Sequence, residues 1–412
     1  RFKMAYLASK LLGAVSQPNG VWEKIIMAFH NGIHNYAWAI IVFTIVLKVI
    51  LLPLDFLNKY VTAKNAKVQK AIQPELEKIQ KQYGNNKQII NQKTMELYKK
   101  NNYSVTGSCV VMLINMALTL TIFITLFSGL NSMAAYKVQY QYNEIQKSYY
   151  SVEDYSNDNL AERYKYYFNE YASFDENLNE EGKIKDEAAA KAYAMDKVKA
   201  EIATYNNEEN NANALQRYGE VKESWLWIDN IWKSDTPWTN SVATFKEYSN
   251  SARATFKDVE IKNDADEQIG TLTADDLKSL AEAEYNQIMD PIRESAGRAN
   301  GYLIVVILAA GLNLISLLAS QGKLKFKRKK KTTLEEEPKQ KQPGGWLMLV
   351  LLPAIMIYIT LIYNAVFGLY IFVSSLVTTA ATPLINWLIN VIDKKKQAKK
   401  DKEVTVSYSR KK

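Results

Sequence analysis

Residues Tyr36–Leu57 read YAWAIIVFTIVLKVILLPLDFL, an apolar run that is long enough to cross a bilayer. One cation, Lys48, lies within the run, and Asp55 lies near its end. A cation at the centre of a membrane helix costs about 2.5–3.5 kcal/mol on insertion scales, so such residues mark functional sites by default. The run therefore predicts a transmembrane helix that carries a functional lysine.

Four further apolar runs predict additional membrane spans. They are Cys109–Leu130, Tyr302–Ala319, Trp346–Tyr363 and Ala365–Ile392. Only Asn364 separates the last two, so we expect them to form a tight re-crossing hairpin. The mean hydropathy of −0.24 is low because a long polar insertion dilutes these runs. Buried helices of a soluble domain rarely show five such runs with charged flanks. The predicted fold class is therefore an all-α polytopic membrane protein with five transmembrane helices.

The charges of the loops predict the orientation of the chain. The loop 58–108 carries ten Lys and Arg against three Asp and Glu, and 321–345 and 393–412 each carry nine against three. The segment 133–300 is acidic, with 19 Lys and Arg against 32 Asp and Glu. Cytoplasmic loops carry an excess of Lys and Arg. We therefore expect the three basic segments in the cytoplasm and both the N-terminus and 133–300 outside. The net charge of +9 is then a signal of topology and does not indicate specific DNA binding.

These signals divide the chain into ten parts. Residues 1–35 are expected to form an outer segment with an interfacial helix at Val21–Asn31. Within it, 1–16 are expected to form a surface helix, with a signal remnant as the alternative. Arg1 in first position indicates a processed or trimmed N-terminus. The remaining parts are spans at 36–57, 109–132, 301–320, 346–363 and 365–392, a cytoplasmic helical hairpin at 58–108, an outer helical insertion at 133–300, a basic loop at 321–345 and a basic tail at 393–412.

The loop 58–108 has the pattern of two paired helices. Lys59–Tyr83 and Lys87–Lys100 have helical composition and are separated by a Gly-Asn-Asn turn. One face of the first segment repeats apolar residues at helical spacing, namely Val68, Ile72, Leu76 and Ile79. We expect an antiparallel helical hairpin, with a plain basic connector as the alternative.

Polar residues inside the spans predict a hydrophilic surface. Thr44 and Lys48 are four residues apart and share a helix face. The candidate groove residues are Lys48, Thr44, Asn115, Asn313, Ser316, Ser374 and Ser375. Two alternatives stay open. Ser, Thr and Asn also join membrane helices by hydrogen bonds, and the ammonium of Lys48 could snorkel to the inner interface.

No pattern in the sequence indicates catalysis. Cys109 is the single cysteine, so no intramolecular disulfide is expected. His30 and His34 have the spacing of a metal pair but lack an evident third ligand, and we interpret them as interfacial residues. There is no nucleotide-binding loop and no catalytic pair within the spans. We expect no enzyme activity, no cofactor and no metal.

Several motifs occur in a fixed order along the chain. The first is TIVLKVILLPLD at residues 44–55. The others are Gln73-Pro74, Gln80-Lys81-Gln82-Tyr83-Gly84, Leu97-Tyr98-Lys99-Lys100, Gly107-Ser108-Cys109, Pro353 and the stretch from Phe367 to Ser374. In this combination they resemble the YidC-type membrane protein insertases, and residues 44–55 resemble the first core span of that family.

The resemblance implies a bacterial plasma-membrane protein with several spans, an outer N-terminus and a cytoplasmic C-terminus. Such a protein inserts and folds nascent membrane proteins through a groove that is open to the cytosol and lipid but closed to the outside. Lys48 matches the position of the groove cation, where relatives often have Arg. The hairpin is expected to receive substrate. The resemblance suggests two further partners, the Sec translocon and the ribosome. The ribosome would bind the basic tail. The alternative role of the tail is to fix the membrane topology. A channel or transporter that uses Lys48 for an anionic substrate is the alternative function.

The chain also departs from the family pattern. Four positions lack the usual Pro, namely Val105, Val111, Ala117 and Asn364. Asn115 stands where Gln is common, and Ile371 and Ser375 stand where Trp and Asn are frequent. The largest departure is the insertion 133–300, for which the resemblance gives no role. Its alternative interpretation is a partly disordered spacer. Its tryptophans, which are expected to anchor a core or lie at the membrane surface, are Trp225, Trp227, Trp232 and Trp238.

Overall fold

The computed structural model describes most of the chain as two compact units. The described residues are 17–84, 86–101, 105–151, 158–181, 183–252, 254, 256–263, 265–320 and 345–409. One unit comprises the described residues of Arg1–Trp38, Gly129–Ile307 and Ile355–Leu369, and the other those of Ala39–Ser128, Leu308–Ala354 and Tyr370–Lys412. We call them the outer-domain unit and the span unit. The surface helix expected at 1–16 and nearly all of the basic loop 321–345 lie outside the described residues.

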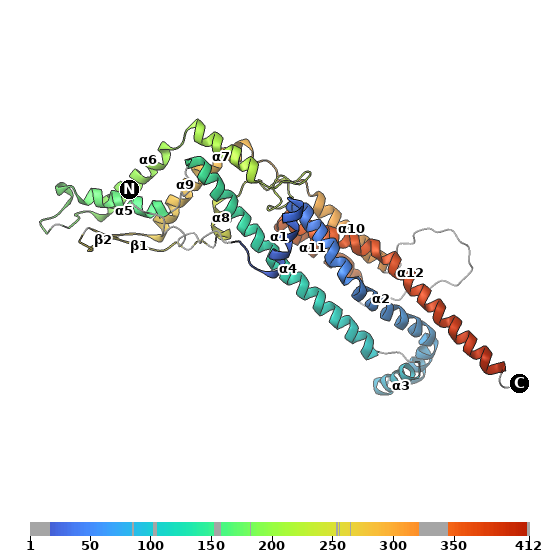
Figure 1. Ribbon diagram of the computed structural model, residues 1–412. Coiled ribbons are helices and arrows are strands. Elements are labelled where there is room, and N and C mark those ends of the chain that lie inside the picture. The colour runs from blue at the N-terminus through green and yellow to red at the C-terminus, as the bar shows by residue number, and fades with distance from the viewer. Residues whose placement is uncertain are drawn as a thin grey trace. The chain divides into compact units, whose positions relative to one another are not determined.

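Three long helices dominate the chain (Figure 1). They are α2 at Tyr36–Tyr83, α4 at Val105–Tyr150 and α12 at Ala365–Ser409. Each contains a stretch long and apolar enough to cross a membrane, within Tyr36–Tyr83, Leu113–Tyr150 and Ala365–Ala398. The all-α polytopic prediction is confirmed. Among the described residues these three helices are long and apolar enough to cross a membrane, while α10 at Ile304–Ser320 has a shorter apolar stretch. The count of five spans therefore stays a prediction.

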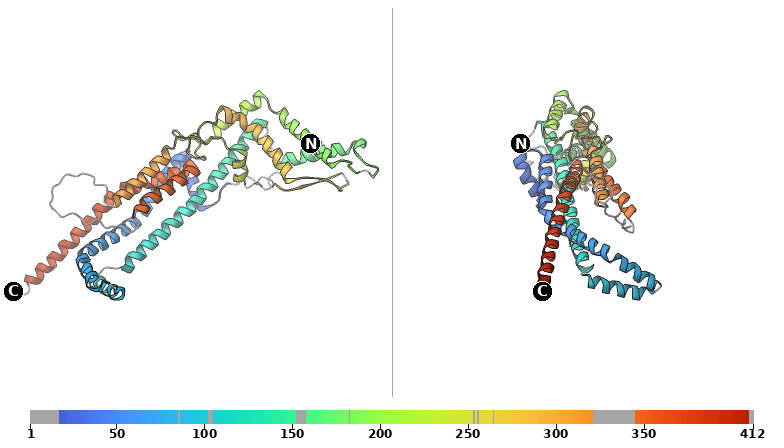
Figure 2. Two further views of the ribbon diagram at one scale, coloured as in Figure 1. Left: turned by 180° about the vertical axis from the view of Figure 1, so that it is seen from behind. Right: turned by 90° about the vertical axis from the view of Figure 1, so that its right-hand side faces the viewer.

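The helix that contains the first predicted span, α2, does not end at residue 57, where that span was expected to end. Helix α2 continues through Pro53 and Pro74 to Tyr83, and α3 at Lys87–Lys100 turns back beside its end (Figure 2). The side chain of Asn86 starts α3 by accepting a hydrogen bond from the backbone of Ile89 at 3.3 Å. The apolar face expected in this part of α2 is less exposed than its neighbours, since Ile72 is buried and Val68, Leu76 and Ile79 are half-buried.

Helix α4 crosses the boundary that was expected between a span and the insertion. It continues from the apolar stretch to Tyr150 without a break at 132–133. The reason is the pattern of its last turns. Val138, Tyr142, Ile145 and Tyr149 follow helical spacing and are all buried in the core of the insertion.

The insertion is a packed domain and not a spacer in its described residues. Its helices are α5 at Asp158–Ala172, α6 at Glu187–Thr204, α7 at Glu208–Val221, α8 at Phe245–Ser251 and α9 at Ala274–Ser295. Helix α9 packs against the other four. A small antiparallel sheet of β1 at Val259–Lys262 and β2 at Gln268–Leu272, which the sequence analysis did not foresee, packs against α5. A 3-10 turn, η2, covers Asp175–Asn177.

Tyrosines supply much of the core of this domain. Tyr142, Tyr218 and Tyr285 are almost fully buried. The hydroxyl of Tyr285 donates to the carbonyl of Ala243 at 2.8 Å, and that of Tyr218 lies 3.0 Å from the Ser241 hydroxyl. Burial raises the pKa of both tyrosines above the ordinary value, so the neutral phenols remain hydrogen-bond donors. Tyrosine thus fills the core and places its polar end on a partner.

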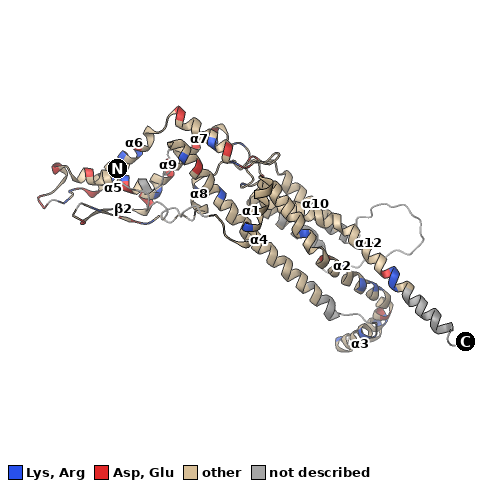
Figure 3. Cartoon of the chain, in the orientation of Figure 1, with Lys and Arg blue, Asp and Glu red and all other residues tan. Residues whose placement is uncertain are grey.

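The described charges follow the pattern of the sequence. Figure 3 shows Lys and Arg along α2, α3 and the start of the α12 tail, whereas Asp and Glu are prominent on the helices of the insertion. Two helices remain to be placed in the chain order: α1 at Val21–Ile33 precedes α2, and α11 at Gly345–Ile362 covers nearly all of the predicted span 346–363. Helix α12 starts directly after Asn364, whose side-chain oxygen accepts a hydrogen bond from the backbone of Phe367 at 3.1 Å.

Candidate functional site

Lys48 extends from the packed face of α2. Ile40, Phe43, Thr44 and Leu47 are buried, and Lys48 follows Thr44 by one helical turn. The opposite face carries exposed apolar side chains, among them Val42, Val46, Val49 and Ile50. Lys48 is half-buried and forms no ion pair with any described residue. Its charge therefore belongs to the packed side of the helix and not to the face that suits lipid.

Thr44 is satisfied within its own helix. Its hydroxyl donates to the carbonyl of Ile40 at 2.6 Å, and its side chain is fully buried. This bond leaves the hydroxyl without a further proton to donate. Its oxygen can still accept a hydrogen bond from a neighbouring group.

Asn115 provides an unsatisfied polar atom on α4. The apolar residues beside it, Leu113, Ile114 and Met116, are each about half exposed. Asn115 is half-buried, and its Oδ1 is buried without a hydrogen-bond partner among the described residues. A buried acceptor of this kind is costly unless water or a ligand reaches it.

The third and fifth predicted spans are joined by a polar contact. The Ser375 hydroxyl of α12 donates to Oδ1 of Asn313 on α10 at 3.1 Å, and the Asn313 amide donates to the carbonyl of Ala309 at 2.9 Å. Ser374, next to this contact, is half-buried. Ser316 lies on α10, one turn after Asn313, with its side chain outside the described set. The Asn313–Ser375 pair fits the role of joining two helices.

Two pairs of candidate residues are placed together within the span unit. Thr44 and Lys48 share one face of α2, while Asn313 and Ser375 are bonded to each other. Within the described residues, no hydrogen bond joins Lys48 or Asn115 to that pair. A single groove lined by all seven candidates stays a prediction.

The structure adds contacts that the sequence analysis missed, at the basic ends of α2 and α12. The Lys59 ammonium donates to the Thr382 hydroxyl at 2.6 Å, and Lys67 pairs with Asp393 at 2.5 Å. Lys396 donates to the Tyr60 hydroxyl at 2.5 Å. The tail thus begins as a helix docked on α2. No local pattern could have revealed this, because the partners lie more than 300 residues apart.

The histidines do not form a metal site in the described part of the chain. The ring of His30 stacks on Tyr36 with centroids 3.7 Å apart, and His34 ends α1 with a φ of 59°. Burial, followed by the charges of Lys137 and His34, lowers the pKa of His30, which favours the neutral ring. No group of three or more His, Cys, Asp or Glu residues that could hold a metal occurs in the described ranges.

Comparison with known proteins gives matches in the N-terminal half of the chain. A family model described as 60Kd inner membrane protein matches residues 28–172, which include α2, α3 and α4. A membrane protein insertase YidC of Fusobacterium nucleatum is 41% identical over 96 residues, 23% of this chain and 45% of the relative.

Two further relatives carry the same name. The YidC protein of Clostridium tetani is 37% identical over 93 residues, 23% of this chain and 40% of the relative. That of Leptospira interrogans is 34% identical over 111 residues, 27% of this chain and 16% of the relative. The chain thus covers less than half of each of these three relatives. No solved structure matches it.

Proposed function

We propose that the chain belongs to the YidC family and is a membrane protein insertase and chaperone that accepts nascent membrane proteins. The observation that carries the proposal is the lysine on the packed face of α2, within the region that the family model matches. Lys48, Thr44, Asn115, Asn313, Ser316, Ser374 and Ser375 would line a hydrophilic groove that opens to the cytosol. Insertion of this kind needs no bond-making step, so no catalytic residue is assigned.

The proposed role of Lys48 is electrostatic. A substrate segment that carries Asp or Glu loses hydration when it leaves the cytosol. A cation about 4 Å away returns about 4 kcal/mol at an effective dielectric constant near 20. The unpartnered acceptor of Asn115 supports a hydrated surface as well. The relatives are named insertases, and no observation favours a channel or transporter.

The proposed topology follows the loop charges. The N-terminus and the insertion 133–300 would lie outside the plasma membrane, with 58–108 and the tail in the cytoplasm. A Sec translocon and the ribosome are the further partners that we propose.

Reconstituted insertion of a single-span substrate with an acidic tail tests the role of Lys48. We expect Lys48→Arg to retain insertion, because it preserves the charge, and Lys48→Glu to abolish it. Lys24→Glu on α1 is the control, since it makes the same change of net charge at an exposed site on another helix. Equal insertion by Lys48→Glu and Lys24→Glu would overturn the groove-cation hypothesis.

A truncation tests the proposed ribosome contact. Removing residues 399–412 deletes six of the nine basic tail residues and the last part of α12. It keeps the contacts that Asp393 and Lys396 of α12 make with α2. If the tail recruits ribosomes, co-sedimentation at low salt should fall, because contacts to RNA phosphates are strongly salt-dependent. Undiminished co-sedimentation would restrict the tail to a role in topology.

A further inference from the structure

The segment 222–244 of the insertion is hydrogen-bonded to the first residues of two apolar helices, α10 and α12. The carboxylate of Asp235 accepts hydrogen bonds from the backbone of Tyr302 at 2.9 Å and of Val305 at 2.8 Å, at the start of α10. The backbone of Ala365, the first residue of α12, donates to the carbonyl of Lys233 at 2.8 Å. The segment is therefore held directly against the ends of α10 and α12.

The same segment reaches α4 and the start of α2. Lys137 of α4 pairs with Glu223 at 2.6 Å, and its ammonium lies 4.2 Å from the ring centre of Tyr36. Trp38 in the first turn of α2 meets Trp225 edge to face, with centroids 5.9 Å apart. Because α2 and α12 are long and apolar enough to cross a membrane, their first residues lie where the apolar layer begins. The segment 222–244 consequently lies at that boundary.

Three large side chains at this boundary are exposed. Leu226 and Trp238 are each 69% exposed, and Tyr302 is 63% exposed. By contrast, Ile228, Ile231 and Trp232 of the same segment are buried, so exposure is selective.

Leu226 occupies the tip of a tight turn. Trp225 and Ile228 exchange backbone hydrogen bonds of 2.9 and 2.8 Å across it. The φ of Leu226 is 50°, in the left-handed region that is unfavourable for a bulky residue. The turn thus presents a leucine outward in a strained backbone, and residual strain of this kind concentrates at binding sites.

We propose that the segment 222–244 anchors the inserted domain in the bilayer interface, with Leu226, Trp238 and Tyr302 entering the boundary between headgroups and acyl chains. The occupant of this surface is lipid and not a protein partner, because the surface continues the ends of the membrane helices. Trp and Tyr are enriched at this depth of the bilayer, where an apolar ring with a polar edge is favoured.

The charges of the segment specify the kind of anchoring. Its two lysines are both paired, Lys222 with Asp229 at 2.5 Å and Lys233 with Glu247. Neither is free to attract an anionic headgroup. Binding should therefore depend on apolar insertion and change little with salt or with the content of anionic lipid.

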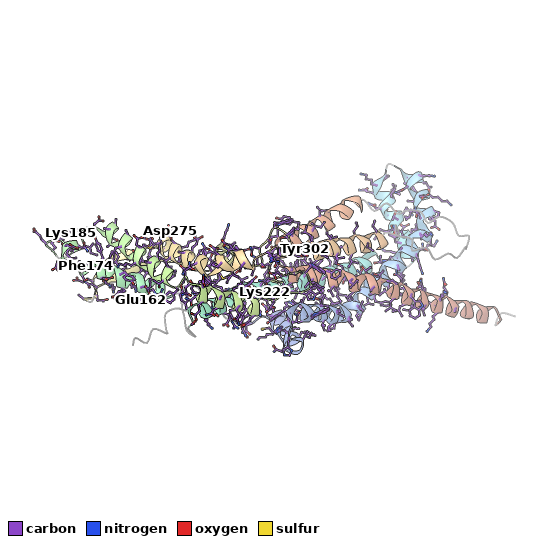
Figure 4. The ribbon with its side chains drawn as sticks, turned by 90° about the horizontal axis from the view of Figure 1, so that it is seen from above. Glu162, Phe174, Lys185, Lys222, Asp275 and Tyr302 are labelled. Carbon is purple, nitrogen blue, oxygen red and sulfur yellow. The ribbon has the colours of Figure 1, made fainter. Side chains whose placement is uncertain are left out.

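Site-specific labelling of the full-length protein tests the anchor. In a Cys109→Ser background, single cysteines at Leu226, Trp238 and Tyr302 are labelled with an environment-sensitive fluorophore. The protein is reconstituted in phosphatidylcholine vesicles whose acyl chains are brominated near the headgroup. The matched control is Phe174→Cys, at an exposed aromatic residue that lies at the opposite end of this unit from Tyr302 (Figure 4).

We expect blue-shifted emission and bromine quenching at the three boundary positions, and neither at Phe174. The result should be the same when part of the lipid is replaced by phosphatidylglycerol. Equal emission shifts and equal bromine quenching for all four labels would overturn the proposed anchor. Quenching at Tyr302 alone, without quenching at Leu226 and Trp238, would overturn it as well. Quenching that requires anionic lipid would instead reject apolar insertion as its basis.

A second measurement does not depend on labelling. Brominated lipid should quench part of the intrinsic tryptophan fluorescence, and Trp238→Phe should reduce the quenched share. An unchanged share would contradict the insertion of Trp238. Because this side chain is mostly exposed, its replacement removes little packing in the fold.

Discussion

Replacing Asp235 with Ala should destabilise the outer-domain unit strongly, because this carboxylate is buried and bridges two parts of the fold. Only 1% of the residue is exposed, and its oxygens accept the backbone N–H groups of Tyr302 and Val305. Burial raises the pKa of Asp235, while these hydrogen bonds act in the opposite direction. The substitution would leave two donors at the start of α10 without their acceptor.

The magnitude follows from these two donors. A buried N–H group without a partner costs about 1–3 kcal/mol. Part of this cost is offset because the burial of a carboxylate charge is itself unfavourable. We expect a net loss of about 2–3 kcal/mol, which corresponds to a fall of roughly 5–10 °C in the unfolding midpoint of a unit of this size.

The assay is thermal unfolding of the purified full-length protein, followed by tryptophan fluorescence. Asp258→Ala is the matched control, since Asp258 also accepts a backbone hydrogen bond at a helix start, from Ala274 at 2.8 Å, but is exposed. Water can replace that acceptor, so the midpoint should change little. Equal midpoints for Asp235→Ala and Asp258→Ala would refute the assignment of Asp235 as a buried link.

Three further predictions concern single contacts. Gly301→Ala should lower the unfolding midpoint, because a Cβ there would lie 1.9 Å from Oδ1 of Asp235; an unchanged midpoint would show that the close approach is dispensable. Burial by itself raises the pKa of Glu247, but Lys233 and hydrogen bonds bring it below its ordinary value of 4.5. Its stabilising effect is therefore present above that value and lost as the pH falls through the lowered pKa, so Glu247→Gln should flatten the pH dependence of the midpoint in this acid range. Ser375→Ala should cost about 0.6 kcal/mol, a typical value for a hydrogen bond between membrane helices, and insertion activity should persist if the contact only joins helices.

Local patterns in the sequence predicted the long helices and a resemblance to a known family. Apolar length predicted membrane-spanning stretches in α2, α4 and α12, since a helix satisfies its own backbone and needs only apolar side chains to enter lipid. The motifs from residue 44 to residue 109 led to the YidC family, which the match over 28–172 supports. The same patterns identified Lys48, because a charge in an apolar run is visible without any knowledge of its neighbours.

Helix boundaries near the insertion were less accessible from the sequence. The end of an apolar run at 132 marks a change of environment and not the end of a helix. Helix α4 continues because its next turns keep an apolar face, now packed in the inserted domain. Hydropathy indicates whether a segment is suited to lipid or to water. Hydrogen bonding and packing determine where the helix ends.

Only the tertiary structure decided which distant residues meet. Asp235 was one of 32 acidic residues in the insertion, and nothing in its local sequence indicated the bonds to Tyr302 and Val305. Trp232 and Trp238 are close in sequence, yet one is buried and the other 69% exposed. The physical reason is that helix formation depends on neighbours along the chain, whereas burial and ion pairing depend on surfaces that come together only when the chain folds.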